Sequence, residues 1–162
     1  ELGWLMSAQA VGGIAGALLA GRFGAAVRPA LLIGVGGVLF GLIDLAIFNY
    51  PALYPGIRLG VLLFAVVGVP GVAMFTGVNV LLQGAVPDQY RGRVFGTYST
   101  TGALLGLAGT ALAGQLGDRV PVVLVLNIQG FVYIVAGLLV LALLRGYATA
   151  APAPDLRAAD LA

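Results

Sequence analysis

Five long apolar runs, almost free of charged side chains, dominate this chain. Crossing the roughly 30 Å hydrocarbon core of a bilayer takes about 20 helical residues, and each run is about that long. Only one run contains a charged residue, Asp44. The runs predict an all-α fold, a polytopic bundle of membrane helices occupying residues 1–145. The predicted helices are Leu2–Gly21, Ala30–Asn49, Leu59–Val86, Val94–Gly117 and Val120–Leu144.

The amino-acid composition supports a membrane protein and excludes chemistry that needs Cys or His side chains. Hydrophobic residues make up 60% of the chain and charged residues 9%, whereas a soluble domain has a charged share of about 25%. A membrane β-barrel would alternate apolar and polar residues, but these runs are continuous. The chain has no Cys and no His, which removes thiolate and imidazole chemistry, and no resident metal or cofactor is expected. No basic cluster is long enough to indicate nucleic-acid binding.

The distribution of arginines predicts the orientation of the helices. The first and third loops and the tail carry six arginines, and the second and fourth loops carry two. The six are Arg22, Arg28, Arg91, Arg93, Arg145 and Arg157; the two are Arg58 and Arg119. Basic loops stay in the cytoplasm, so the C-terminus is expected there, with residues 146–162 forming a disordered tail. An outside start without a signal peptide leads us to expect further helices upstream in the complete protein.

The loops between helices predict where the chain turns. The second loop, Asn49–Gly56, contains Pro51 and Pro55, which are expected to stop the helix there. The third loop, Val86–Gly96, contains two of the cytoplasmic arginines.

Asp44 lies five residues before the expected end of its helix, about 7–8 Å by helical rise. We therefore expect its carboxylate to reach water among the outer headgroups, and proton coupling is the alternative.

The third loop and its surroundings resemble a known transporter family. Residues Pro87–Gly96 follow the pattern P-x-x-x-R-G-R-x-x-G, after a helix ending at Gln83 and before a Gly-rich helix. This order resembles the loop between the tenth and eleventh helices of major facilitator superfamily transporters. The first loop is similar to that family's second G-x-L-a-D-R-x-G signature, but only Arg22 and Gly24 of its motif remain. An ion-pair latch at the first loop is therefore not expected.

The resemblance implies an architecture and a function. The five helices would be helices eight to twelve of twelve in a plasma (inner) membrane transporter, nearest to drug and siderophore exporters. Such a secondary transporter moves a small amphiphilic solute by alternating access, and here efflux is expected. Its partners would be the lipid bilayer, the missing N-terminal helices and the small-molecule substrate. A non-transporting membrane subunit or scaffold is the alternative, while absence of His and Cys argues against a membrane enzyme.

Polar residues inside the third run are the main substrate-binding candidates. Thr76, Asn79 and Gln83 are spaced to share one helix face, next to Phe75. Pro70 interrupts the same helix and can form a hinge. If this is the tenth helix, the resemblance implies that it lines the central cavity. The other interpretation is interhelical hydrogen bonding. Two further residues, Gln9 and Tyr98, are expected to border the same cavity.

Loop residues are the candidates for conformational control. Arg91 and Arg93 either anchor the loop as cytoplasmic charges or hold carbonyls at neighbouring helix ends or a carboxylate such as Asp88. For Asp88 itself the preferred interpretation is a solvated loop acid. Arg22 and Gly24 complete this set through the first-loop motif. In the helices, the small-residue faces around Gly12 and Gly16, and around Gly102 and Gly106, predict close helix packing.

Overall fold

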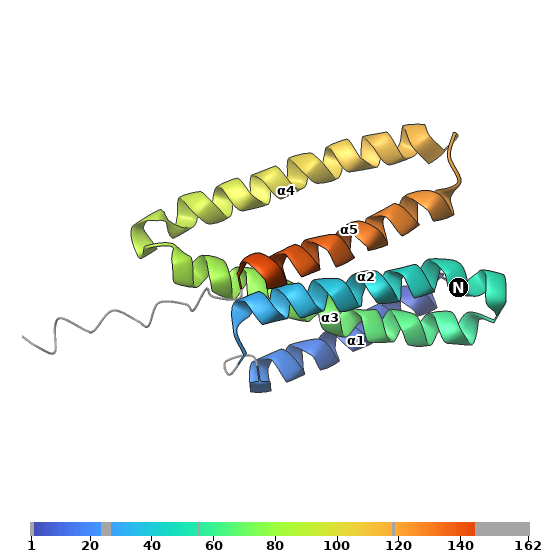
Figure 1. Ribbon diagram of the computed structural model, residues 1–162, viewed down its shortest axis with the longest axis horizontal. Helices are drawn as coiled ribbons and strands as arrows, with labels where there is room; N and C mark the ends of the chain where they lie inside the picture. The colour runs from blue at the N-terminus through green and yellow to red at the C-terminus, as the bar shows by residue number, and fades with distance from the viewer. Residues whose placement is uncertain (1, 24–26, 55, 118, 145–162) are drawn as a thin grey trace, which may run out of the picture.

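The computed structural model describes residues 2–23, 27–54, 56–117 and 119–144. The described part of the chain is helical and contains no strand, which confirms the predicted all-α fold (Figure 1). The predicted tail at residues 146–162 and the candidate Gly24 lie outside the described residues. The helices are α1 Leu2–Phe23, α2 Pro29–Leu53, α3 Ile57–Ala85, α4 Asp88–Gly117 and α5 Val122–Leu143.

Four of these helices, α1, α2, α3 and α5, are long and apolar enough to cross a membrane. The fourth helix, α4, has the length but is less apolar, because residues 97–102 are Thr-Tyr-Ser-Thr-Thr-Gly and its first turns carry Asp88, Arg91 and Arg93. Among the described residues, the place of α4 as a fifth membrane helix therefore stays a prediction. Its weaker hydropathy is typical of a helix that does not face lipid on all sides.

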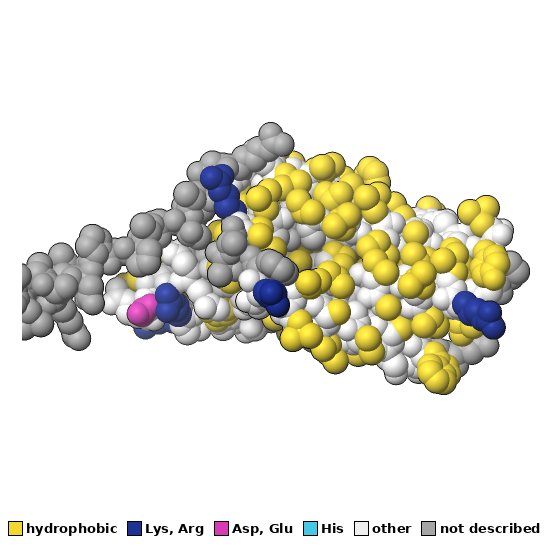
Figure 2. Space-filling view, turned by 90° about the horizontal axis from the view of Figure 1, so that it is seen from below, with side chains coloured by type: hydrophobic (Ala, Val, Ile, Leu, Met, Phe, Trp, Pro, Cys, Tyr) yellow, Lys and Arg dark blue, Asp and Glu magenta, His cyan; other side chains and the backbone are white. Residues whose placement is uncertain are grey.

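The helices pack in the order α1, α3, α2, α5. The third helix contacts both α1 and α2, and α2 also contacts α5 along its length. The fourth helix lies apart, beyond α5 in Figure 1, and none of its residues is buried. On one face of the molecule, hydrophobic side chains cover the middle and arginines lie toward the ends (Figure 2). Such a surface suits a bundle surrounded by lipid.

Glycines allow the helix backbones to come close together. A Cβ atom on Gly68 of α3 would lie 2.5 Å from the backbone nitrogen of Gly13 in α1. A Cβ atom on Gly137 of α5 would lie 2.6 Å from the carbonyl oxygen of Gly34 in α2. Carbon atoms in ordinary contact are about 3.5–4.0 Å apart, so any side chain at these positions would push the helices apart. Small residues are what membrane helices use to pack in this way.

The two predicted small-residue faces have different outcomes. Gly12 and Gly16 are buried against α3, so the prediction for the first helix is confirmed. The corresponding face of α4 packs against nothing in the described part of the chain, because no atom lies within 4 Å of a Cβ atom at Gly102 or Gly106. The sequence identified a face suited to packing in both helices, but the partner of α4 is not among the described residues.

Two loops are shorter than predicted. The second helix continues through Pro51 to Leu53, so the expectation that proline stops it near Asn49 is wrong. Pro51 cannot donate to the Ile47 carbonyl oxygen, but the helix still closes after it, with the Tyr54 N–H donating to the Tyr50 carbonyl oxygen at 2.8 Å. The fourth helix starts at Asp88 and not at residue 94, so the arginines of the predicted third loop lie in its first turns.

Candidate functional site

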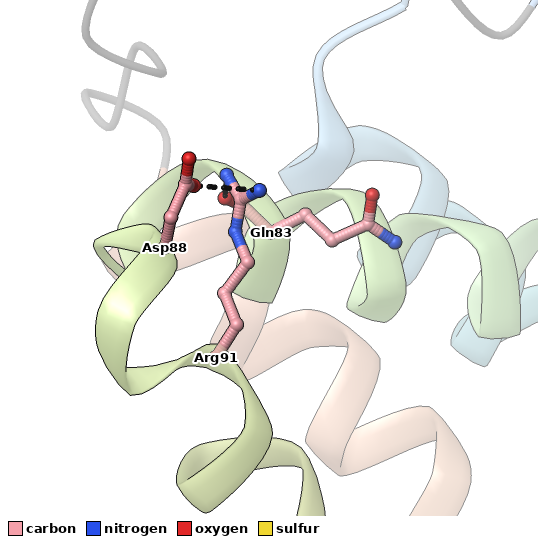
Figure 3. Close-up of polar contacts among 3 residues, drawn as sticks. All are labelled: Gln83, Asp88 and Arg91. Carbon is pink, nitrogen blue, oxygen red and sulfur yellow. Dashed lines mark hydrogen bonds and ion pairs between the residues drawn. The ribbon is translucent and has the colours of Figure 1, made fainter.

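The best-defined polar contact links the end of α3 to the start of α4. Arg91 Nη2 donates a hydrogen bond to the carbonyl oxygen of Gln83 at 2.8 Å, and Arg91 Nη1 lies 2.7 Å from Asp88 Oδ1 (Figure 3). We call this arrangement the α3–α4 latch. It bears out the interpretation that an arginine of this loop holds a helix-end carbonyl and a carboxylate. A guanidinium suits this role because its donors form a planar fork.

The latch corrects the preferred interpretation of Asp88. This residue is not a free loop acid, because it lies in the first turn of α4 and pairs with Arg91. An acid there also faces the positive end of the helix dipole. The Asp88 side chain is nevertheless 86% exposed and that of Arg91 45% exposed. Solvent screens such a pair, so it contributes about 0.5 kcal/mol or less and sets geometry more than stability.

A pocket of about 410 Å³ lies beside the latch, between α3 and α4. It brings together Arg93 and Tyr98, two of the residues predicted from the sequence. Its lining is completed by Leu82 of α3 and by Val94 and Thr97 of α4. The surface of this pocket is almost entirely apolar, so these residues line it mainly with the carbon atoms of their side chains.

The polar face of α3 is defined by Thr76, Asn79 and Gln83. Asn79 donates its amide N–H to the Phe75 carbonyl oxygen of its own helix at 2.8 Å. By helical spacing this face continues that of Val72, whose side chain lies near Gly13 and Gly16 of α1. Among the described residues, no hydrogen bond made by the side chain of Thr76, Asn79 or Gln83 joins it to another helix. The side chains of this polar face therefore lie on the α1 side of α3, and they can form further hydrogen bonds.

The candidates do not all meet in one place. The Gln83 side-chain amide points away from Arg91, which holds only the Gln83 backbone (Figure 3). Phe75 is 66% exposed and remains available for contact. The backbone of Gln9 packs near Gly68, eight residues or about 12 Å of helix from Thr76. Gln9 therefore borders the middle of the α1–α3 interface and not the pocket beside the latch.

Pro70 and Arg22 occupy positions suited to their expected structural roles. Pro70 is buried in α3 and lies between Gly68, which packs on α1, and Gly71, which packs near Phe40 of α2. The missing backbone hydrogen bond at Pro70 therefore lies where α3 packs against both α1 and α2. Arg22 is exposed in the last turn of α1, where a positive charge complements the helix dipole.

One pair of side chains forms hydrogen bonds between helices far apart in the sequence. Asn127 of α5 exchanges two amide hydrogen bonds with Asn49 of α2, at 2.6 and 3.3 Å. Asn49 also donates to the Leu45 carbonyl oxygen at 2.7 Å. Asn49 had been placed at the start of a loop, so its partner could not be anticipated. The pair joins α2 to α5 by hydrogen bonds at one end of their interface.

Asp44 lies deeper than expected. Because α2 extends to Leu53, Asp44 is nine residues, or about 13–14 Å, from the end of its helix. It is also buried, with only 6% of its surface exposed, so the expectation of an acid in headgroup water is wrong. One turn before it, Phe40 touches Tyr133 of α5 with ring centroids 4.9 Å apart. Asp44 therefore shares the stripe of α2 that faces the α5 side of the bundle.

No cluster of metal-binding side chains supports a metal centre. Among the described residues, no group of three or more His, Cys, Asp or Glu side chains lies close enough to hold an ion. The polar side chains in the described part of the chain include amides, hydroxyls, guanidiniums and the carboxylates of Asp44 and Asp88.

Comparison with known proteins shows which family this chain belongs to. The model of the Major Facilitator Superfamily matches residues 1–160. The chain belongs to this superfamily. As a superfamily member it is an integral membrane protein of a transporter family, and the predicted resemblance to this superfamily is confirmed. No solved structure matches the chain.

Several relatives in the superfamily are exporters. The chain is 32% identical over 119 residues to a multidrug efflux pump, Tap, of Mycolicibacterium fortuitum, covering 73% of this chain and 28% of that protein. It is 28% identical over 144 residues to the enterobactin exporter EntS of Escherichia coli, covering 89% and 34%. It is 30% identical over 143 residues to the transporter YfiS of Bacillus subtilis, covering 86% and 33%. The chain thus spans about a third of the length of these relatives.

Proposed function

We propose that this chain forms part of an exporter of small amphiphilic molecules. The observation that carries the proposal is the match of residues 1–160 to the superfamily, together with relatives named as multidrug and enterobactin exporters. The exposed Phe75 and the apolar pocket between α3 and α4 suit the apolar part of such a solute, and the polar face of α3 suits its polar part. Membership of a transporter family favours transport over catalysis.

The five helices correspond, in this proposal, to helices eight to twelve of a larger bundle. Two observations support this: the chain spans about a third of its relatives, and α4 has no buried residue. The small-residue face of α4, which includes Gly102 and Gly106, would pack against helices from the missing N-terminal part. The excess of arginines in the first and third loops supports a cytoplasmic C-terminus in a plasma (inner) membrane.

The proposed mechanism is alternating access, in which two bundles rock around a central cavity. The polar face of α3 would line that cavity, with Thr76 and Asn79 offering hydrogen bonds to the solute. The α3–α4 latch fixes the angle between two neighbouring helices at one membrane surface, because Arg91 binds groups from both. Holding that angle in one state and releasing it in the other would bias the conformational equilibrium.

The test is transport by the complete protein reconstituted into liposomes. Efflux or uptake of a fluorescent amphiphilic dye is measured for the complete protein and for the 162-residue chain alone. Export by the complete protein, with no flux through the isolated chain, supports the proposal. Absence of dye or siderophore transport by a correctly folded complete protein would favour the alternative, a membrane subunit or scaffold.

A second arm of the test addresses the solute contact. Asn79→Ala is expected to change the KM for transport, since it removes an amide from the polar face of α3. Asn127→Ala serves as the control, because its partner is Asn49 on the opposite flank of α2. Matched expression and thermal stability are required for the comparison. If only Asn127→Ala alters transport, the assignment of α3 as the cavity helix is incorrect.

A further inference from the structure

A shallow pocket lies at the start of α3, at the end of that helix away from the α3–α4 latch. It has a volume of about 340 Å³ and is lined by Tyr54, Arg58, Leu59 and Leu62. Tyr54 and Leu62 are 52% and 59% exposed, so the pocket opens to the surroundings of the bundle. The Tyr54 ring lies close to the backbone of Gly56, where a Cβ atom would be only 3.0 Å from Tyr54 Cζ. A glycine at position 56 thus leaves room for this ring beside the start of α3.

An apolar stripe leads from this pocket along α3 toward the middle of the membrane. Leu59, Leu62, Val66 and Val69 are spaced i, i+3, i+7 and i+10, which places them on one face of the helix. Val66 is 46% exposed, and Val69 also lines an apolar groove of about 370 Å³ between α3 and α2. By helical rise the stripe is about 15 Å long, which equals the hydrocarbon depth of one bilayer leaflet.

Arg58 lies at the depth of the lipid headgroups. The third helix is long and apolar enough to cross a membrane, and residue 71 is its midpoint. With this midpoint at the bilayer centre, Arg58 is about 20 Å from the centre, whereas the hydrocarbon layer ends at about 15 Å. Tyrosine is enriched at the same depth, because its ring is apolar and its hydroxyl is polar. The pocket therefore spans the boundary between headgroups and acyl chains.

The Arg58 guanidinium has no partner in the part of the chain that the structure describes. Its side chain is exposed, and no hydrogen bond or ion pair there involves it, in contrast to Arg91, which pairs with Asp88. The sequence has no acid between Asp44 and Asp88, and Asp44 is buried in the bundle. A cation without a partner, next to an exposed apolar stripe, suits an anion that is attached to a hydrocarbon chain.

We propose that this pocket binds one anionic phospholipid, with its phosphate at Arg58 and an acyl chain along Leu62, Val66 and Val69. An uncharged lipid would leave the guanidinium without a partner, and a soluble anion would leave the apolar stripe uncovered. The Tyr54 hydroxyl can donate a hydrogen bond to the same phosphate. Thr76, where the polar face of α3 begins, is about 21 Å further along the helix than Leu62. The proposal therefore does not depend on the transported solute or on the direction of transport.

The test measures which lipids the complete protein retains when it is released from nanodiscs and analysed by native mass spectrometry. The nanodiscs contain equal amounts of phosphatidylglycerol and phosphatidylcholine with identical acyl chains. We expect a preference of about fivefold for phosphatidylglycerol, the size expected for one arginine near an anionic headgroup. Arg58→Gln should abolish this preference, and Arg58→Lys should keep most of it.

Arg119→Gln is the matched charge control. Arg119 is also exposed, but it does not line the pocket. It lies three residues before α5, at the same end of the bundle, because Asn127 of α5 pairs with Asn49 near the end of α2. Arg119→Gln should therefore keep the preference. A loss as large as that in Arg58→Gln would overturn the proposal, because it would show a general effect of surface charge.

The apolar stripe is tested separately from the charge. Leu62→Ala should lower retention of both lipids, whereas Leu138→Ala, on α5 and 53% exposed, should not. Equal retention of the two lipids by the unaltered protein would overturn the proposal, and this measurement decides it even if Arg58→Gln fails to fold. An unchanged preference in a folded Arg58→Gln protein would also overturn it. So would crosslinking of Leu62→Cys to another helix of the complete protein, because protein would then cover the stripe.

Discussion

A close backbone approach between α1 and α3, at Gly68, provides a direct test of how the bundle is held together. Gly68→Ala adds one methyl group whose carbon would lie 2.5 Å from the Gly13 nitrogen and 2.6 Å from the Gln9 carbonyl oxygen. Both obstructing atoms are backbone atoms, which cannot rotate away. Restoring contacts of about 3.5 Å requires the two helices to separate by roughly 1 Å over this region.

The expected change in unfolding free energy for Gly68→Ala is the difference between two opposing effects. Overpacking of a tight interface costs about 1–3 kcal/mol, and the upper part of that range applies because backbone is the obstacle. Replacing a helical glycine by alanine returns up to about 1 kcal/mol. Gly68→Ala should therefore lose about 2 kcal/mol of unfolding free energy. Gly13→Ala is the matched control, since its methyl group would meet only Val72 Cγ2, at 3.7 Å.

The assay is unfolding in mixed micelles by titration with sodium dodecyl sulfate, followed by far-ultraviolet circular dichroism. Gly13→Ala is expected to unfold at the same or a higher detergent fraction than the unaltered protein, and Gly68→Ala at a clearly lower one. If Gly68→Ala is as stable as the unaltered protein, the two helices are not in backbone contact. The packing argument for the glycines of this bundle would then fail.

Three further outcomes are expected. Single cysteines at Ala52 and Gln89, both exposed, should be labelled from opposite sides of the membrane, and labelling from one side would contradict the arginine-based topology. A double-mutant cycle of Asn49→Ala and Asn127→Ala should give a coupling energy of about 0.6–1.7 kcal/mol, and additive effects would show that the amide pair does not join α2 to α5. Arg91→Gln should change unfolding free energy by less than about 1 kcal/mol yet alter the transport rate of the complete protein; an unaltered rate would remove the latch from the mechanism.

The sequence was sufficient to predict the helices and some of their contacts. Continuous apolar runs admit only helices in a bilayer, because every backbone polar group must be satisfied within the segment. The spacing of Gly12 and Gly16 predicted a packing face on α1, and the structure places α3 there. One of the two interpretations of the loop arginines was contact with a helix-end carbonyl or a carboxylate, and Arg91 makes both contacts. In each case the interacting groups are close in sequence or share one helix face.

The remaining features depend on which helices become neighbours, and sequence spacing carries no such information. Asn49 and Asn127 are 78 residues apart, so nothing local relates them. The burial of Asp44 was missed because its depth was measured from a proline, and Pro51 turned out to lie within the last turn of α2. A proline near a helix end costs little, since few backbone hydrogen bonds remain to be lost there. Because the predicted end of α2 was four residues too early, Asp44 was expected among the headgroups, whereas the structure buries it in the bundle.

The arrangement around Pro70 connects packing to the proposed transport. Pro70 cannot donate to the Val66 carbonyl oxygen, so α3 is most easily bent at this point. On either side of it, Gly68 contacts the backbone of α1 and Gly71 lies against Phe40 of α2. Bending α3 there would therefore displace both neighbouring helices and swing its far end, where Arg91 holds the Gln83 carbonyl oxygen. A change in the latch and a change at the hinge are thus mechanically the same motion of one helix, which also carries the polar face proposed to meet the solute.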